Sequence, residues 1–174
     1  MTSFYIFVEG SRDKIFFNAL FGNKLCLLGD DFNIVEYAPM KDDKINNFIK
    51  GIKSMENCDY IFIADQDGNK TKKDDILKKY SFLDKSKTFI SVFEIESWIA
   101  AGISDDLIKK HKIKFHNRDT SLLTKEAFEK IVPEHMSVMQ FISHIINDYS
   151  LEKALDLNMS FKILYDYLYT KKAS

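Results

Sequence analysis

The chain has 174 residues, a length typical of one globular domain, and 45% of them are hydrophobic and 29% charged, as in an ordinary soluble protein. The formal net charge of -1 excludes a global electrostatic attraction to nucleic acid or to a membrane surface, so any nucleic-acid contact has to come from a local patch. Two cysteines, Cys26 and Cys58, do not suffice for a disulfide framework or a thiolate metal site, which favours a reducing compartment. The apolar run at residues 4–8 is too short for a signal peptide or a membrane span, and we therefore expect a cytoplasmic protein without a membrane partner.

The first half of the sequence alternates between short apolar runs and amphipathic segments. Runs at residues 4–8, 33–37, 59–64 and 88–93 predict strands, and the first and third are continuously apolar, as in strands buried on both faces. Between them, helices are predicted over about residues 11–21, 41–55 and 74–80. This alternation predicts an α/β fold with a four-stranded parallel sheet, right-handed crossovers and helices on both faces.

The pattern changes after Trp98, where no further strand is predicted. Helical periodicity covers about residues 104–110, 124–131, 137–146 and 160–169, and Pro133 separates the second of these helices from the third. We therefore expect a sheet-containing core at residues 1–103 and a helical extension at residues 104–174 that packs on the core as part of a single domain.

Acidic residues follow the first and the third predicted strand. Glu9 ends the first strand, and Asp13 lies in the first turn of the next helix, where the helix dipole favours an anion. Asp65 and Asp67 follow the third strand with one residue between them, so they point the same way in an extended segment. Ligands of open parallel sheets bind beyond the carboxyl ends of the strands, and carboxylates that meet there repel one another unless protons or a cation neutralise them. The sequence therefore predicts a site for one or two Mg²⁺ or Mn²⁺ ions, which stabilise charge on phosphoryl oxygens.

A plain turn and an EF-hand loop are the alternatives to a metal site for residues 65–68, Asp-Gln-Asp-Gly. Asp and Gly are favoured in turns, and for this segment alone a plain turn is the more frequent case. An EF-hand loop is excluded, because it requires Gly at its sixth position and Glu at its twelfth, where this chain has Lys70 and Ile76, and because a strand precedes it. The metal-site interpretation depends on the combination with Glu9.

The two acidic motifs together resemble the Toprim signature of topoisomerases, bacterial primases and related nucleases. Val-Glu-Gly at residues 8–10, followed by Asp13, is similar to its first motif, and Asp-x-Asp-Gly at residues 65–68 to its second. The spacing is most similar to that of overcoming-lysogenization-defect nucleases and of small stand-alone Toprim-like phage-defence proteins, over about residues 4–102. The resemblance implies a Toprim-like catalytic core that hydrolyses phosphodiester bonds of DNA or RNA with a metal ion, in phage defence or a mobile-element system. The catalytic and metal-binding residues that it implies are Glu9, as general base or ligand, and Asp13, Asp65, Asp67 and Glu96 as ligands, the last to a second ion.

A third acidic motif follows the fourth strand in these nucleases, and residues 94–99 occupy that place. The resemblance implies that Glu94 lies behind Glu96 at the metal. From the residues alone, Glu94 and Glu96 share a face if the strand continues and diverge if a helix begins at once, and a charged helix start explains either of them equally well.

Basic residues are the candidates for contact with nucleic acid. A run at residues 108–118 carries five basic residues and no acid, with Phe115 and two histidines between them, which is typical both of a backbone-binding surface and, more often, of a solvated face. Three lysines at residues 70–73 follow the Asp pair. They either neutralise substrate phosphates or belong to an ordinary solvated loop. By the resemblance, Lys125 corresponds to a lysine beyond the third motif. The full set of basic candidates is Lys70, Lys72, Lys73, Lys109, Lys110, Lys112, Lys114, Arg118 and Lys125.

Three functions remain open from the sequence. The first is the metal-dependent nuclease. The second is nucleotidyl transfer or strand passage, as in primases and topoisomerases, for which a partner would have to supply further domains. The third is a non-catalytic Toprim-like module that senses or binds a partner. The chain has no Walker A sequence, so we expect any ATPase activity to come from a partner protein, and a homo-oligomer is a further expectation.

Overall fold

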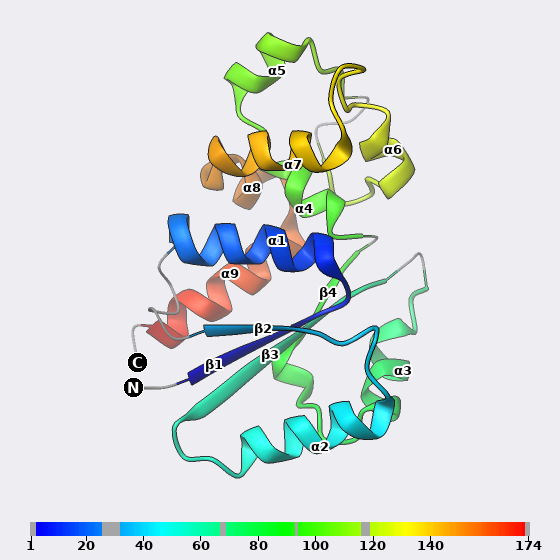
Figure 1. Cartoon of the computed structure of the whole chain (residues 1–174), viewed down its shortest axis with the longest axis vertical. Coiled ribbons are helices and arrows are strands. Elements are labelled where there is room, and N and C mark those ends of the chain that lie inside the picture. The colour runs from blue at the N-terminus through cyan, green and yellow to red at the C-terminus, as the bar shows by residue number, and fades with distance from the viewer. Residues whose placement is uncertain (1–2, 26–31, 67–68, 93, 116–118, 173–174) are drawn as a thin grey trace. The chain divides into compact units, whose positions relative to one another are not determined.

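A four-stranded parallel sheet with the strand order β2-β1-β3-β4 organises the first part of the chain (Figure 1). Its strands are β1 (Ser3–Val8), β2 (Phe32–Glu36), β3 (Cys58–Asp65) and β4 (Thr88–Ser91). The predicted α/β class and the four predicted strands are thus confirmed, although the fourth ends earlier than expected.

The computed structural model describes residues 3–25, 32–66, 69–92, 94–115 and 119–172. By its internal contacts the chain divides into two compact units, residues 1–90 and residues 91–174. The expectation that the helical extension packs on the core stays a prediction. Within the described residues, no helix is long and apolar enough to span a membrane.

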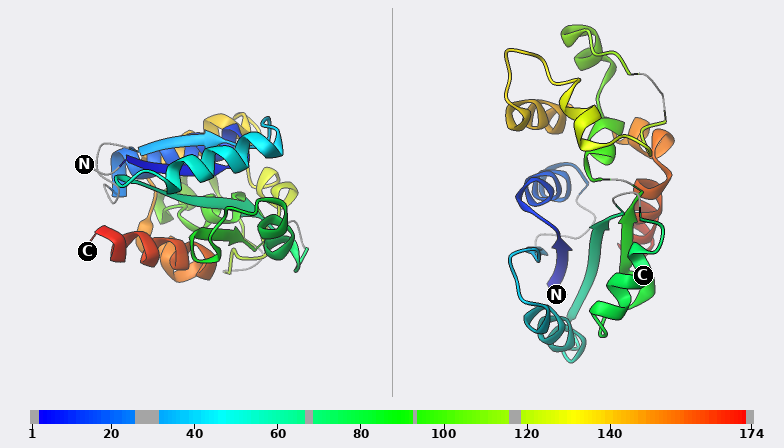
Figure 2. Two further views of the ribbon diagram at one scale, coloured as in Figure 1. Left: turned by 90° about the horizontal axis from the view of Figure 1, so that it is seen from below. Right: turned by 90° about the vertical axis from the view of Figure 1, so that its right-hand side faces the viewer.

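Helices cover both faces of the sheet in the first unit. Helix α1 (Ser11–Ala19) lies on one face and α2 (Asp42–Lys53) on the other (Figures 1 and 2). Helix α1 continues as a π-helical segment, η1 (Leu20–Leu25), where the sequence predicts an ordinary helix that ends near residue 21. Helix α2 carries acidic residues in its first turn and lysines in its last, which complements its dipole.

The core on the α2 face is built from alternating strand residues. Phe7 and Phe62, which are adjacent across β1 and β3, stack with their ring centroids 5.9 Å apart, and Ile45 and Ile49 of α2 belong to the same buried cluster. Helix α3 (Lys72–Lys79) contributes Ile76 to this cluster, and the short 3-10 turn η2 (Lys85–Lys87) leads into β4. The other strand residues alternate to the opposite face, as the period of two requires.

The second unit consists of helices in its described part, as the sequence predicts. They are α4 (Glu96–Ala101), α5 (Asp105–His111), α6 (Lys125–Glu129), α7 (Val138–Asn147), α8 (Leu151–Leu157) and α9 (Met159–Lys172). Of these, α4 and α8 were not predicted from periodicity. Trp98 is fully buried, with its ring centroid 5.7 Å from that of Phe161. Trp98 and Phe161 are therefore core residues.

Candidate functional site

The direction in which the chain adds strands to the sheet reverses between β1 and β3. The chain passes from β1 to β2 in one direction along the sheet and then crosses back over β1 to reach β3, which is why α1 and α2 cover opposite faces. In open α/β sheets, ligands bind beyond the carboxyl ends of the strands at such a reversal. The parallel register pairs Phe7 with Phe62, so its continuation places Glu9 level with Ala64, one residue before Asp65. This pairing brings Glu9 and Asp65 to the same edge of the sheet, as the sequence predicts.

The backbone holds Glu9 at this edge. The amide of Tyr37 donates a hydrogen bond to the carbonyl of Val8 (2.9 Å), and the amide of Ala38 donates to the carbonyl of Glu9 (3.2 Å). The chain beyond β2 therefore continues to follow β1 past the end of both strands. The Glu9 side chain remains partly exposed.

Tyr37 is the point on which the acids converge. Its ring stacks on Phe62 with the centroids 4.5 Å apart, and its side chain is buried. Burial raises the pKa of the Tyr37 phenol, and the negative charges of Glu9, Asp65 and Asp13, in that order, raise this pKa further. Three carboxylates, one directly after β1, one at the end of β3 and one in α1, thus act on one hydroxyl, which stays protonated. Tyr37 was not among the candidate residues from the sequence, although it ends the second predicted strand, at residues 33–37.

Asp13 has a structural role in addition to its place among the acids. Its side chain is only 8% exposed, and one carboxylate oxygen accepts a hydrogen bond from the amide of Gly10 at 3.0 Å. This bond satisfies one of the free N–H groups at the start of α1.

Asp65 is the last residue of β3 and is partly exposed. Asp67, the second acid of the motif, lies outside the described residues. Beyond it, the side chain of Asn69 accepts hydrogen bonds from the amide (3.0 Å) and the hydroxyl (2.8 Å) of Thr71, which directly precedes α3. A polar turn at residues 69–71 therefore leads into α3.

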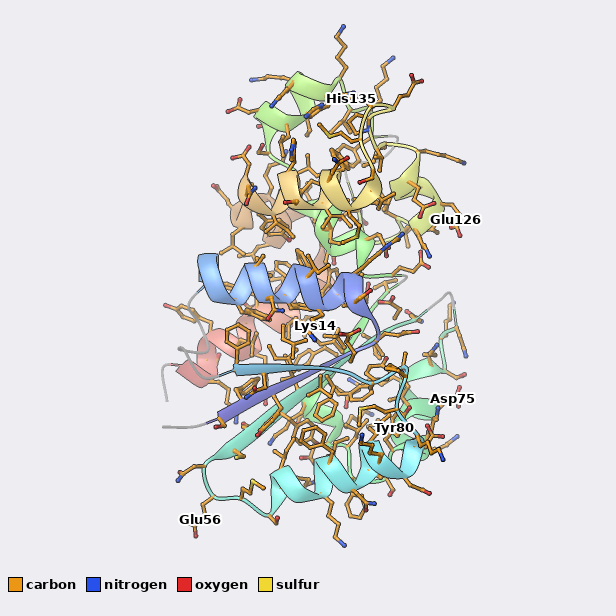
Figure 3. The ribbon with its side chains drawn as sticks, viewed as in Figure 1. Lys14, Glu56, Asp75, Tyr80, Glu126 and His135 are labelled. Atoms are coloured by element: carbon orange, nitrogen blue, oxygen red, sulfur yellow. The ribbon has the colours of Figure 1, made fainter. Side chains whose placement is uncertain are left out.

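A cavity of about 310 Å³ opens beside Glu9. Tyr80 lies on its wall, and the Tyr80 hydroxyl donates to Asp42 at 3.3 Å. Lys79 forms an ion pair with the same carboxylate at 3.0 Å, which raises the pKa of Lys79. Figure 3 shows Tyr80 and Asp75, which also lines the cavity, on the same side of the molecule. The remaining lining residues are Tyr37, Ala38, Met40, Lys72 and Ile76.

The three lysines after the Asp pair have different surroundings. Lys72 is partly buried and lines the cavity with Glu9, so it is placed to meet a phosphate there. The ammonium of Lys73 donates to the carbonyl of Thr88 at 2.6 Å, and burial, with help from Lys85, lowers the pKa of Lys73. Lys73 therefore connects α3 to the start of β4, whereas Lys70 is exposed. Their roles toward nucleic acid stay predictions.

Glu94 and Glu96 belong to the second unit and diverge, because α4 begins at Glu96. The carboxylate of Glu94 accepts a hydrogen bond from the amide of Lys125, the first residue of α6. Glu96 lies in the first turn of α4 and is only 4% exposed. The structure thus gives Glu94 a capping contact, while its role and that of Glu96 at a metal remain predictions.

The donor set at the β1–β3 edge consists of carboxylate oxygens, which Mg²⁺ and Mn²⁺ prefer. The shared effect of Glu9, Asp65 and Asp13 on Tyr37 indicates that a cation at this edge would be favoured by all three charges. Among the described residues, no group of three His, Cys, Asp or Glu side chains is arranged to hold a metal ion, and Asp67 does not belong to those residues. The donor chemistry fits a hard cation whose shell would be completed by Asp67, water or substrate.

The basic run of the second unit lies at the end of α5 and beyond it. Lys109 and Lys110 are exposed in the last turn of the helix, and Lys112 and Lys114 are exposed after it. Arg118 lies outside the described residues. The charged side of this run is therefore accessible to a polyanion.

Comparison of the chain with known protein families, with curated proteins and with solved structures finds no match. The fold and the site themselves define the class: an α/β protein with a parallel sheet and an acidic edge at its topological reversal.

Proposed function

We propose that this chain is a Toprim-type nuclease that hydrolyses phosphodiester bonds of DNA or RNA with Mg²⁺ or Mn²⁺. The observation that carries the proposal is the parallel register of β1 and β3, which brings Glu9 and Asp65 to the same edge of the sheet, where the charges of Glu9, Asp65 and Asp13 raise the pKa of Tyr37. The resemblance of the two acidic motifs to the Toprim signature supports the same function.

The residues of this edge have complementary roles in the proposal. Asp65, Asp67 and Glu9 would hold the ion, which when bound stabilises negative charge on phosphoryl oxygens. Glu9, partly exposed beside the cavity, is also the acceptor for a proton of the attacking water. Tyr37 stays protonated because burial and its acidic neighbours raise its pKa, so its hydroxyl can donate a hydrogen bond. Glu96 as ligand of a second ion belongs to the same proposal.

The setting is proposed along with the chemistry. The protein would act in the cytoplasm, in phage defence or a mobile-element system, with any ATPase function supplied by a partner protein. A non-catalytic module remains the rival, and it has no need of a metal ion.

The test is incubation of the full chain with labelled single- and double-stranded DNA and RNA, in Mg²⁺, Mn²⁺ or chelator. Glu9→Gln and Asp65→Asn should each lower the cleavage rate by about a hundredfold or more, because each removes an acid from the reacting centre. Glu56→Gln is the matched control, since Glu56 is exposed between α2 and β3, at the amino edge of the sheet (Figure 3).

Cleavage that persists in chelator, or in the Asp65→Asn variant, would refute the proposal. Failure to cleave any of the substrates with either metal would favour the non-catalytic module.

A further inference from the structure

A basic hollow of about 730 Å³ lies in the second unit. It is formed by the end of α5, the chain after it, α6 and residues 130–135, and Figure 3 marks His135 at this end of the unit. Among the described residues that line it, Glu134 is the one acid, in a chain whose net charge is -1. Its basic lining residues are Lys110, Lys112, Lys114, Lys130, His111 and His135. A concentration of positive charge against the balance of the whole chain indicates an anionic ligand.

The local backbone brings two of these lysines together. Lys112 ends α5 in the left-handed conformation, with φ 52° and ψ 40°, which glycine adopts more readily than lysine. The next residue, Ile113, is buried, and its amide donates to the carbonyl of Ile108 at 3.0 Å. Lys112 and Lys114 therefore lie on either side of the buried Ile113, and both line the hollow.

His111 belongs to the lining of the hollow. Its Nε2 is buried and has no hydrogen-bond partner among the described residues. The ring lies 5.9 Å from that of His135 and 6.3 Å from that of His144, measured between centroids. The surrounding lysines would repel a divalent cation, and the described residues contain no cluster of metal ligands here, so an anion is the fitting partner.

A small apolar pocket of about 170 Å³ adjoins the hollow and shares Lys114, Ala127 and Ile131 with it. Phe115 and Leu122 belong to its lining, and Leu122 is 59% exposed. A positive groove beside an aromatic, apolar surface is the arrangement by which proteins bind single-stranded nucleic acid, with phosphates on the charges and bases on the ring.

We infer that this surface binds single-stranded nucleic acid. The phosphates lie in the hollow against Lys110, Lys112, Lys114 and Lys130, and a base lies against Phe115 in the adjoining pocket. A single strand is required because a paired base has its face covered by its neighbours in the stack. The inference rests on the proposed function for the kind of ligand, and the binding itself needs neither metal nor the β1–β3 edge.

The experiment measures binding of a fluorescent single-stranded oligonucleotide, and of its duplex, to the full chain by anisotropy, in chelator and over a series of salt concentrations. The double variant Lys112→Gln/Lys130→Gln should weaken single-strand binding about tenfold at low salt. It should also reduce the slope of log affinity against log salt concentration by about 0.7 per lysine. The control is the double variant Lys44→Gln/Lys78→Gln, which removes the same number of positive charges at exposed positions of α2 and α3. Phe115→Leu should weaken single-strand binding about fivefold without changing the salt slope, because it removes stacking and not charge.

Two results would overturn the inference: duplex binding at least as tight as single-strand binding, and equal losses in the hollow and control variants. The Asp65→Asn variant separates this inference from the proposed function. If the Asp65→Asn variant and the wild type bind the single strand equally tightly but the wild type cleaves no substrate, the inference stands and the nuclease proposal falls. If the wild type cleaves and the lysine variants bind and cleave like it, the inference falls and the nuclease proposal stands.

Discussion

The side chains of the candidate site differ in how strongly burial and hydrogen bonds restrain them. Asp13 is buried and committed through one oxygen to the start of α1, whereas Glu9 is fixed by its backbone and leaves its carboxylate partly exposed. In the proposed site, Asp13 would be the ligand held in a fixed position and Glu9 the more accessible base.

Gly102 is required for steric and not for conformational reasons. It follows α4 with φ -91°, which any residue can adopt. A Cβ atom at this position would lie 2.1 Å from the ring of Tyr149, whose hydroxyl donates to the carbonyl of Trp98 at 2.8 Å. We expect Gly102→Ala to lower the free energy of unfolding by about 3 kcal/mol or more, because the anchored ring cannot move aside. Chemical denaturation followed by the fluorescence of Trp98, the one tryptophan of the chain, measures the change.

The double-mutant cycle with Tyr149→Leu is the control for this prediction. Once the ring is removed, Gly102→Ala should be much better tolerated, so the two changes should couple by more than about 1 kcal/mol. Additive effects would show that the contact with Tyr149 is not the reason for the glycine.

The lowered pKa of His111 predicts that the protein loses stability at acidic pH. Burial, Lys110, His135 and His144, in that order, lower its pKa below the ordinary 6.5. Glu134 and Phe141 are its other notable neighbours, the first in the hollow and the second 6.3 Å away between ring centroids. A histidine whose pKa is lower in the folded than in the unfolded state contributes stability above pH 6.5, and this stability is lost as the pH falls toward the folded-state pKa.

The free energy of unfolding should therefore decrease below about pH 6.5 in the wild type, and the decrease should be smaller in His111→Gln. Urea titrations of both proteins between neutral and mildly acidic pH measure the difference. Parallel curves for the two proteins would contradict the prediction.

At the scale of elements, α9 is joined to the rest of the second unit by its N-cap. Asn158 is fully buried, and its side-chain oxygen accepts from the amide of Phe161 (3.1 Å) and the hydroxyl of Ser160 (2.8 Å). Its amide group donates to the hydroxyls of Ser97 and Thr120, both at 3.3 Å. One side chain therefore caps α9, contacts α4 and holds the loop before α6.

Asn158→Ala should lower the free energy of unfolding by about 2–4 kcal/mol, because it removes the cap and leaves buried hydroxyls without this partner. Asn147→Ala, at an exposed position of α7, is the control and should stay within about 0.5 kcal/mol of the wild type. Thermal and denaturant unfolding of the two variants and the wild type measure these changes in the free energy of unfolding. A loss below about 1 kcal/mol for Asn158→Ala would mean that water replaces the whole network.

The sequence predicted the elements whose pattern is strong and missed those that depend on distant contacts. The buried strands and the amphipathic α2 are visible as local periodicity. All six residues of α4 are buried, so its sequence has no amphipathic period, and the bond from Lys125 to Glu94 joins residues far apart in the chain. In the site, Glu9 and Asp65 could be predicted because both end apolar runs, whereas the role of Tyr37 depends on charges from three other elements.

At the scale of the whole molecule, the acidic edge should make stability depend on metal ions. In chelator, Asp65→Asn should unfold at the same temperature as the wild type or at a higher one, because it relieves repulsion from Glu9 and Asp13. With Mg²⁺ or Mn²⁺ at a hundredfold excess over the dissociation constant, bound ion should stabilise the wild type by about 2.7 kcal/mol, or roughly 5–10 °C, and leave the variant unchanged.

Thermal melts of both proteins, with and without metal, measure this reversal. If Asp65→Asn melts well below the wild type in chelator, Asp65 is a structural turn residue, and the proposed metal site loses its central ligand.

The position of β1 inside the sheet has a consequence for how the protein folds. Tyr5 pairs with Tyr60, so the central contact of the sheet closes a loop of more than fifty residues. Contacts between such distant positions require the chain to lose much conformational freedom before they form, which slows folding. On the ribosome, β1 and β2 emerge first and can pair only with each other, and the carboxyl ends of β1 and β3 cannot meet until β3 has been synthesised. The acidic edge is therefore assembled late, and a nascent chain that stalls before β3 exposes one side of β1 as an unpaired edge.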